Sequence, residues 1–249
     1  MSTALLRMEI RRKLRDRRTL MFAVILPAIF FLTFSAGTQS KVAGLDIGPY
    51  VMISMATYGA MNALFTGGGL IAAERAIGWN RQLRIAGLPG RDYVVTKALM
   101  AYVLAVPGLV AVFILGATVK NVSLDASTWI EAAVSILLGL LPVAALGIAI
   151  GYSASRPATL QPIFGLGSAL LALLGGMFYP ADLFPRAMLD IVKLLPTYWS
   201  AEAGRAVLQG SWVGWQGVAV LTVWTLVFGA LAIWMYQRDA IRPASAGTT

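Results

Sequence analysis

The stretch AAVSILLGLLPVAALGIAIGYSAS, residues 132–155, decides the fold class. It contains no Asp, Glu, Lys or Arg, and its 24 residues exceed the roughly 20 that an α-helix needs to cross a bilayer. A segment in lipid must pair its backbone within a helix or within a closed barrel. Barrel strands alternate in polarity, whereas residues 136–141 are apolar on every side, so the stretch predicts a membrane-spanning helix.

The rest of the chain repeats this pattern. Five further charge-free stretches lie at 19–40, 47–73, 98–119, 157–181 and 206–237. Each is long enough to cross a bilayer, and the last is interrupted by Trp and Gly near its start. We therefore predict an all-α integral membrane protein with one domain, 1–249. Its six spans are predicted at 19–40, 49–72, 97–119, 130–153, 160–178 and 216–236.

Composition excludes most other classes of protein. Hydrophobic residues make up 58% of the chain and charged residues 12%, and the mean hydropathy is +0.75, so a soluble enzyme is excluded. The chain has no His and no Cys, which removes His-based general-base chemistry, disulfides and His- or Cys-ligated metals. The carboxylates are scattered without fixed spacing, so we expect no catalytic residues and no metal site.

The basic residues predict the orientation. The net charge is +9, and with the N-terminus inside, fifteen Lys and Arg fall in cytoplasmic segments against five outside. This distribution follows the positive-inside rule and predicts a multi-pass protein of the cell membrane with both termini in the cytoplasm. The excess charge is explained in this way, and we expect no nucleic-acid partner.

The first 18 residues predict a basic amphipathic helix. Leu6, Ile10 and Leu14 recur on one face of the helix, and an arginine follows each of them on the neighbouring face. Such a helix lies at the membrane surface and contacts lipid headgroups. The alternative is a plain basic flank that only sets the topology.

Two segments outside the spans predict further short helices. The segment AAERAIGWNRQLRIAGLPGRD, residues 72–92, predicts an exposed cytoplasmic helix that docks on a partner, or else a solvated loop helix. Between spans five and six, Phe184, Met188, Ile191 and Leu195 form one apolar face, and a second helix is predicted at 200–208. These two outer helices are either re-entrant or merely interfacial.

The charge-free stretches carry no ionisable side chain other than tyrosine. Proton- and ion-driven transporters normally place such groups within the membrane. The chain also lacks the GxxxxGK[ST] phosphate-binding loop. If the protein moves a substrate, its energy is therefore expected from another chain.

Three segments together carry a family resemblance. They are Glu74-Arg75-xx-Gly78-xxx-Gln82-Leu83-Arg84 followed by Pro89, the Gly-Met-Phe-Tyr-Pro stretch that ends at Pro180, and Leu195-Pro196-Thr197-Tyr198 followed by Glu202-xx-Arg205. With six spans and a basic N-terminal helix, the chain resembles the permease subunit of ABC type 2 exporters. Within that family it looks most like the daunorubicin-resistance type of actinobacterial drug-export permease.

The resemblance implies a permease homodimer that binds two separate ABC ATPase subunits, in which ATP and Mg are held, so that this chain binds no cofactor itself. The implied cargo is a hydrophobic or amphiphilic compound. The alternatives are a permease of the same fold that exports polysaccharide, lipid or peptide, and a passive channel or assembly protein.

The resemblance also implies roles for particular residues. The coupling helix that contacts the ATPase would carry Glu74, Arg75, Gly78, Arg81, Gln82, Leu83, Arg84 and Pro89. The connecting helix would carry Arg7, Ile10, Arg11 and Leu14. The translocation path and outer gate would be lined by Phe30, Phe34, Met55, Phe65, Phe178, Tyr179, Pro180, Phe184 and Tyr198.

Overall fold

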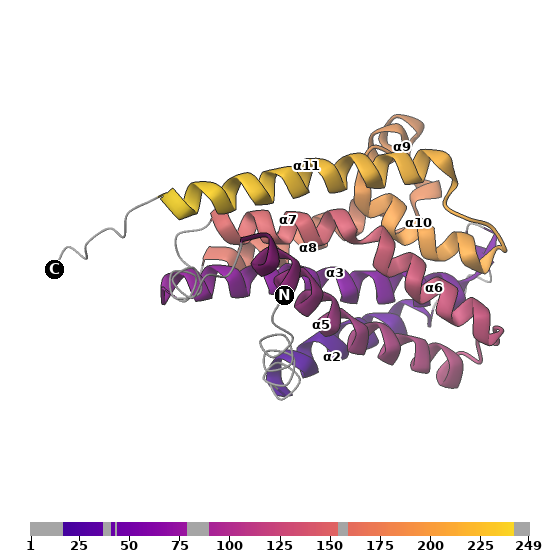
Figure 1. Cartoon of the computed structure of the whole chain (residues 1–249). Coiled ribbons are helices and arrows are strands. Elements are labelled where there is room, and N and C mark those ends of the chain that lie inside the picture. Colours follow the sequence, from indigo (N-terminus) through magenta and orange to yellow (C-terminus); the bar gives the residue numbers. More distant parts are fainter. Residues whose placement is uncertain (1–16, 37–40, 43, 79–89, 154–158, 242–249) are drawn as a thin grey trace.

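The computed structural model describes residues 17–36, 41–42, 44–78, 90–153 and 159–241. In this part the chain forms an elongated bundle of helices (Figure 1). The long helices are α2 (Arg17–Phe34), α3 (Ile47–Ala76), α5 (Gly90–Val119), α6 (Ala126–Gly139), α7 (Leu141–Ser153), α8 (Leu160–Leu174) and α11 (Gly214–Ile241). The short elements are β1 (Lys41–Val42), β2 (Leu45–Asp46), η2 (Ala181–Leu183), α9 (Arg186–Val192) and α10 (Pro196–Leu208).

Helix α3 lies at the centre of the bundle. It contacts α2, α5, α7, α8 and α10, and most of its side chains from Gly48 to Ala72 are buried. Because it is enclosed by protein, α3 tolerates small and polar residues such as Ser54 and Thr57, whose hydroxyls donate to carbonyls one turn earlier. The central position of α3 is what brings residues from distant parts of the sequence into contact at its two ends.

Glycines set how closely α3 approaches its neighbours. A Cβ atom on Gly68 would overlap with the carbonyl of Gly147 on α7, and one on Gly151 would overlap with the carbonyl of Gly68. Helix α3 continues without a break through the three consecutive glycines 67–69 to Ala76. The glycines permit backbone-to-backbone packing, as small residues do between membrane helices.

Three helical segments among the described residues are long and apolar enough to cross a membrane. They are Val95–Val119, Ala126–Ser153 and Gly214–Asp239, and shorter apolar helices occupy Val24–Phe34 and Leu160–Leu174. Helices occupy most of each of the six predicted intervals, but α2 and α8 are shorter than the intervals 19–40 and 160–178. The membrane character is thus supported for three segments, and the count of six spans stays a prediction.

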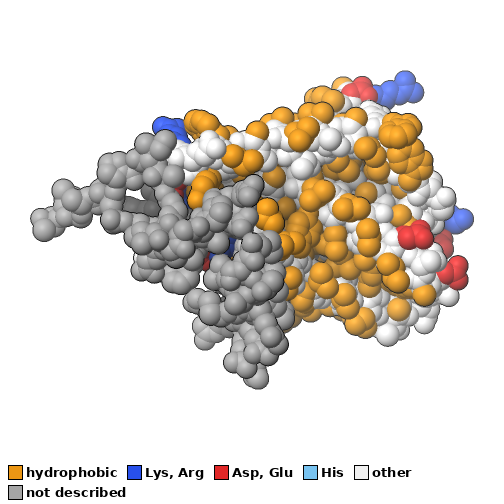
Figure 2. All heavy atoms as spheres, in the orientation of Figure 1, with side chains coloured by type: hydrophobic (Ala, Val, Ile, Leu, Met, Phe, Trp, Pro, Cys, Tyr) orange, Lys and Arg blue, Asp and Glu red, His pale blue; other side chains and the backbone are white. Residues whose placement is uncertain are grey.

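The surface fits a membrane setting. On the face shown in Figure 2, hydrophobic side chains cover the band between the two ends of the bundle, whereas the visible charged side chains lie toward the ends. Helix α11 is the most exposed of the three candidate spans, with only 6% of its most apolar window buried. An apolar surface of this extent suits contact with lipid.

Within the described residues, the structure contains one pair of strands beside the helices. The two-residue strands β1 and β2 pair antiparallel, with Lys41 opposite Asp46, and Gly44 lies in the turn with φ of 78°. The sequence predicted only helices, because two-residue strands carry no periodic signal.

Two short helices, α9 and α10, lie between α8 and α11, and their outer position stays a prediction. The apolar face of α9 is turned from the one expected. Val192 of α9 is fully buried, whereas Ile191 is 64% exposed. Ala181, Val192, Tyr198 and Trp199 form a small core of their own. Pro185 precedes α9, and Pro196 opens α10, where a missing N–H costs nothing.

Candidate functional site: polar and aromatic clusters along helix α3

A buried arginine joins α10 to the Asp46 end of α3. The side chain of Arg205 is 3% exposed, and its Nη2 donates to the Gly176 carbonyl at 2.6 Å and to Ser54 Oγ at 3.0 Å. Its guanidinium also lies 4.4 Å from the centroid of the Tyr50 ring, a cation–π distance. Glu202, one turn earlier, supplies a carboxylate at 3.5 Å. Arg205 therefore links three segments that are distant in sequence.

The carbonyl of Gly176 completes this cluster. Gly176 has φ of 70°, which favours glycine, and its carbonyl accepts a second hydrogen bond from the Tyr50 hydroxyl at 2.9 Å. Arg205 Nε is buried without a hydrogen-bond partner among the described residues. The sequence placed Arg205 outside the membrane spans, on the short helix predicted at 200–208. Its only signal was the Glu202-xx-Arg205 spacing, which says nothing about burial.

An aromatic cluster lies beside this polar one. Phe178 contacts Tyr58 edge-on at 4.7 Å and Phe30 at 5.7 Å between ring centroids, and Phe34 contacts both phenylalanines. These rings come from α2, α3 and the segment after α8. Phe30, Phe34 and Phe178, which were predicted to line a path, are thus in mutual contact, and Tyr58 is a member that the sequence analysis did not name.

The other predicted path residues lie apart from this cluster. Met55 is fully buried in the core, and Phe65 is stacked on Phe164 at 5.4 Å. Tyr179 is 46% exposed and is stacked on Phe184 at 5.7 Å, on the segment that follows Phe178. Pro180 precedes η2, and Tyr198 packs against Trp199. Burial raises the pKa of Tyr198 to about 12, so its phenol is neutral at physiological pH.

Ion pairs tie the Ala76 end of α3 to two other helices. Lys97 of α5 is 6% exposed, and its Nζ lies 2.7 Å from Glu74 Oε1. Arg75 pairs with Asp239 of α11 and also donates to the carbonyl of Tyr152 on α7 at 2.8 Å. Adjacent residues of α3 therefore bind α5 on one side and α7 and α11 on the other.

The predicted coupling residues fall into two groups. Glu74 and Arg75 are already engaged within the chain, and Gly78 ends the α3 turn with φ of 73°. The remaining coupling residues, Arg81, Gln82, Leu83, Arg84 and Pro89, lie outside the described residues, as do the connecting-helix residues Arg7, Ile10, Arg11 and Leu14. Contact with a partner chain stays a prediction for all of them.

These clusters suit mechanical coupling better than catalysis. The described residues hold no group of three His, Cys, Asp or Glu that would bind a metal ion. The charged groups pair with each other and with carbonyls at the two ends of one buried helix, and the middle of that helix is apolar and closely packed.

Comparison with known proteins identifies the family. Residues 36–234 match the family described as ABC-2 family transporter protein. The chain belongs to the ABC-2 transporter family. A Bacillus subtilis (strain 168) protein with the name of a transport permease, YvfS, is 26% identical over 233 residues, which cover 93% of this chain and 95% of the relative. This ABC-2 family protein is thus a membrane permease, and the family as a whole implies an ATPase partner.

Proposed function

We propose that the chain is the membrane-spanning permease subunit of an ABC exporter. It moves a hydrophobic or amphiphilic compound out of the cell, and a separate ATPase that holds ATP and Mg supplies the energy. Two permease and two ATPase subunits form the complex. The Ala76 end of α3 and both termini face the cytoplasm, in line with the charge distribution. The cargo class of the daunorubicin-resistance type is the finer proposal.

The ion-paired end of α3 carries this proposal. The chain leaves α3 at Ile77, enters the predicted coupling segment, and returns in α5 at Gly90. Glu74 and Arg75 lie in the last turn of α3, just before that segment, and they bind α5, α7 and α11. If an ATPase displaces the segment, α3 and the three helices bound to it, α5, α7 and α11, therefore move together. In this reading Glu74 and Arg75 transmit motion within the permease and do not themselves form the ATPase contact.

The aromatic cluster supports the cargo class. Aromatic rings present apolar faces with slightly charged edges, and they accommodate varied apolar shapes without fixed hydrogen bonds. Phe30 and Phe34 of α2 are partly exposed, and they contact Phe178 of the segment that leads into η2. The cluster therefore lies where the helices of the bundle meet the outer segment.

The test separates ATP hydrolysis from export. The tagged permease is purified with its ATPase and reconstituted into vesicles, and ATP hydrolysis and export of a fluorescent amphiphile are both measured. Asp239→Ala removes the ion pair with Arg75, and Arg238→Gln is the matched control because Arg238 is exposed. We expect Asp239→Ala to keep hydrolysis and to lower export at least about fivefold, the lower end of typical coupling free energies. Arg238→Gln should change neither.

Two outcomes contradict different parts of the proposal. Normal export by Asp239→Ala would refute the coupling role of the ion pair and leave the permease assignment intact. Recovery of a folded protein with no ATPase, even after crosslinking, would refute the permease assignment and favour a passive channel or an assembly protein.

A further inference from the structure

A lateral groove lies on the side of the bundle, between α6, α10 and α11. It has a volume of about 780 Å³, within the range of about 300–1,000 Å³ that small-molecule sites occupy. Small residues create the hollow, since Gly139 and Ala203 face each other at its base. Two of the three candidate membrane spans form its walls, so the groove opens toward lipid.

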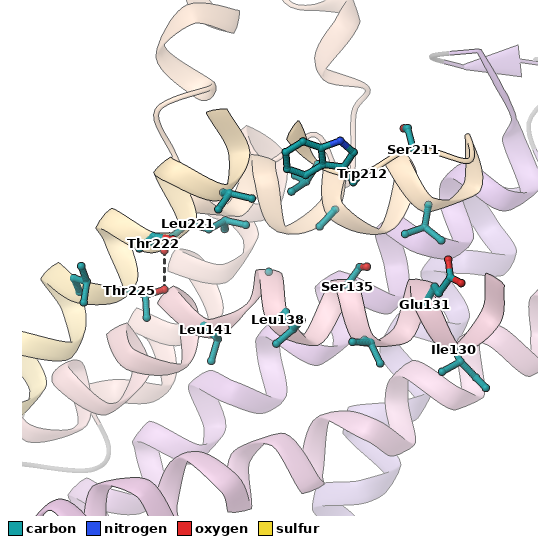
Figure 3. Close-up of a pocket in the computed structure, with 17 residues that line it drawn as sticks. Ile130, Glu131, Ser135, Leu138, Leu141, Ser211, Trp212, Leu221, Thr222 and Thr225 are labelled. Atoms are coloured by element: carbon teal, nitrogen blue, oxygen red, sulfur yellow. Dashed lines mark hydrogen bonds between the residues drawn. The ribbon is translucent and has the colours of Figure 1, made fainter. Parts of the chain in front are cut away.

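The lining is mainly apolar, and its one carboxylate, Glu131, lies at one end, with Ser135, Thr222 and Thr225 farther along (Figure 3). Figure 3 shows Glu131 and Ser211 at one end of the groove and Leu141 and Thr225 at the other. The rims carry exposed apolar side chains, among them Ile130 at 65% and Leu226 at 68%. From Glu131 to Leu141 the helical rise alone gives about 15 Å. The groove therefore fits an elongated molecule with an apolar body.

The charge in the groove is of one sign. Glu131 is the sole ionisable side chain among its lining residues, and it forms no ion pair with any described residue. Trp212 lies in the lining as well, 54% exposed and in edge-on contact with Trp215. Tryptophan prefers the headgroup level of a bilayer, and its ring face attracts cations. Both groups favour a positively charged head over a negative one.

We propose that this groove binds a cationic amphiphile from the membrane, with its ammonium group beside Glu131 and its alkyl chain between α6 and α11. A phospholipid fits less well, because its phosphate would lie near Glu131 with no Lys or Arg in the lining to hold it. The proposal requires the membrane setting of α6 and α11, and it goes beyond the export reaction because it concerns binding alone.

The experiment uses photoreactive probes in nanodiscs that contain the full chain. Three diazirine-bearing probes are compared: an alkyltrimethylammonium, the carboxylate with the same alkyl chain, and a phosphatidylethanolamine. Labelled peptides are mapped by mass spectrometry. We expect α6 and α11 to be labelled about fivefold more strongly by the ammonium than by the carboxylate, the upper range for an exposed ion pair.

Two pairs of variants identify the groove as the site. Glu131→Gln should abolish the preference for the ammonium probe, whereas Asp125→Asn, an exposed carboxylate before the same helix, should keep it. Thr222→Phe should fill the groove and reduce labelling by every probe. Val223→Phe, at an exposed neighbouring position outside the lining, should not. Thermal unfolding checks that each variant is folded.

Three results would overturn the inference. They are equal labelling by the ammonium and carboxylate probes, an ammonium preference that persists in Glu131→Gln, and stronger labelling of the groove by the phosphatidylethanolamine than by the ammonium. The last result would make a membrane phospholipid the occupant.

Discussion

Replacement of Arg205 by Met should release the outer helices from α3. The substitution keeps an unbranched side chain and removes the hydrogen bonds to Ser54 and Gly176 together with the cation–π contact to Tyr50. A hydrogen bond to a charged group contributes about 1.5–3 kcal/mol. The variant no longer has to bury a charged guanidinium, and this gain offsets part of the loss. We therefore expect the free energy needed to separate α10 from α3 to fall by ~2 kcal/mol, the contribution of one such bond.

The chain itself provides a clean assay for this opening, because it contains no cysteine. Thr197 of α10 is 1% exposed, and its hydroxyl makes no hydrogen bond with the described residues, so Thr197→Cys places a protected thiol at little cost. Local opening exposes the thiol to a maleimide reagent. A loss of ~2 kcal/mol corresponds to labelling that is about thirtyfold faster, since 1.4 kcal/mol is a factor of ten.

The control is Arg186→Met in the same background. Arg186 is exposed on α9, so its replacement removes the same charge from the same outer segment without opening a buried contact. Equal labelling rates in the Arg205 and Arg186 variants would refute the reasoning. They would show that packing of Tyr198 and Trp199, and not the buried arginine, holds α10 in place.

Two further predictions concern the other contacts of α3. Gly68→Ala should lower the unfolding temperature in detergent by the equivalent of about 1–3 kcal/mol, because its Cβ overlaps with the Gly147 carbonyl. Gly165→Ala, which meets nothing within 4 Å, should leave the temperature unchanged, and equal shifts would contradict the close packing. Lys97→Met should destabilise the protein by leaving the Glu74 carboxylate without its 2.7 Å partner, and adding Glu74→Gln should restore much of the loss. Equal unfolding temperatures for the single and double variants would argue against a coupled pair.

The sequence predicts the helices well, because charge-free runs are a direct consequence of lipid as a solvent. The predicted intervals 49–72, 97–119 and 130–153 lie within α3, within α5 and across α6 and α7. Two short helices, α9 and α10, also precede α11, where the sequence predicts two. The break at Leu140, between α6 and α7, has a local cause in the sequence, because Pro142 lacks the N–H that a continuous helix would use. The turned face of α9 was not predictable in the same way, because it depends on which neighbour packs against the helix.

The candidate site was less predictable than the fold. Glu74 and Arg75 were singled out as contacts for a partner chain, which stays a prediction, whereas their ion pairs with Lys97 of α5 and Asp239 of α11 were not predicted. Arg205 was counted as an external charge, because it falls outside the six predicted spans, on the predicted helix 200–208. Its burial depends on the carbonyl of Gly176 and on Tyr50. Pairings between distant segments are the part that a single sequence leaves open.

The packing of α3 also determines where this bundle is able to move. Against α7 the contact at Gly68, Gly147 and Gly151 is backbone on backbone, which leaves no side chain to rearrange at that point, so these two helices are expected to move as one body. Against α2 and α8 the contacts of α3 include aromatic pairs, Tyr58 with Phe30 on one side and Phe65 with Phe164 on the other. Aromatic side chains exchange rotamers at lower cost than two backbones separate. A force applied at Glu74 and Arg75 should therefore shift α3 and α7 together and open the aromatic contacts first.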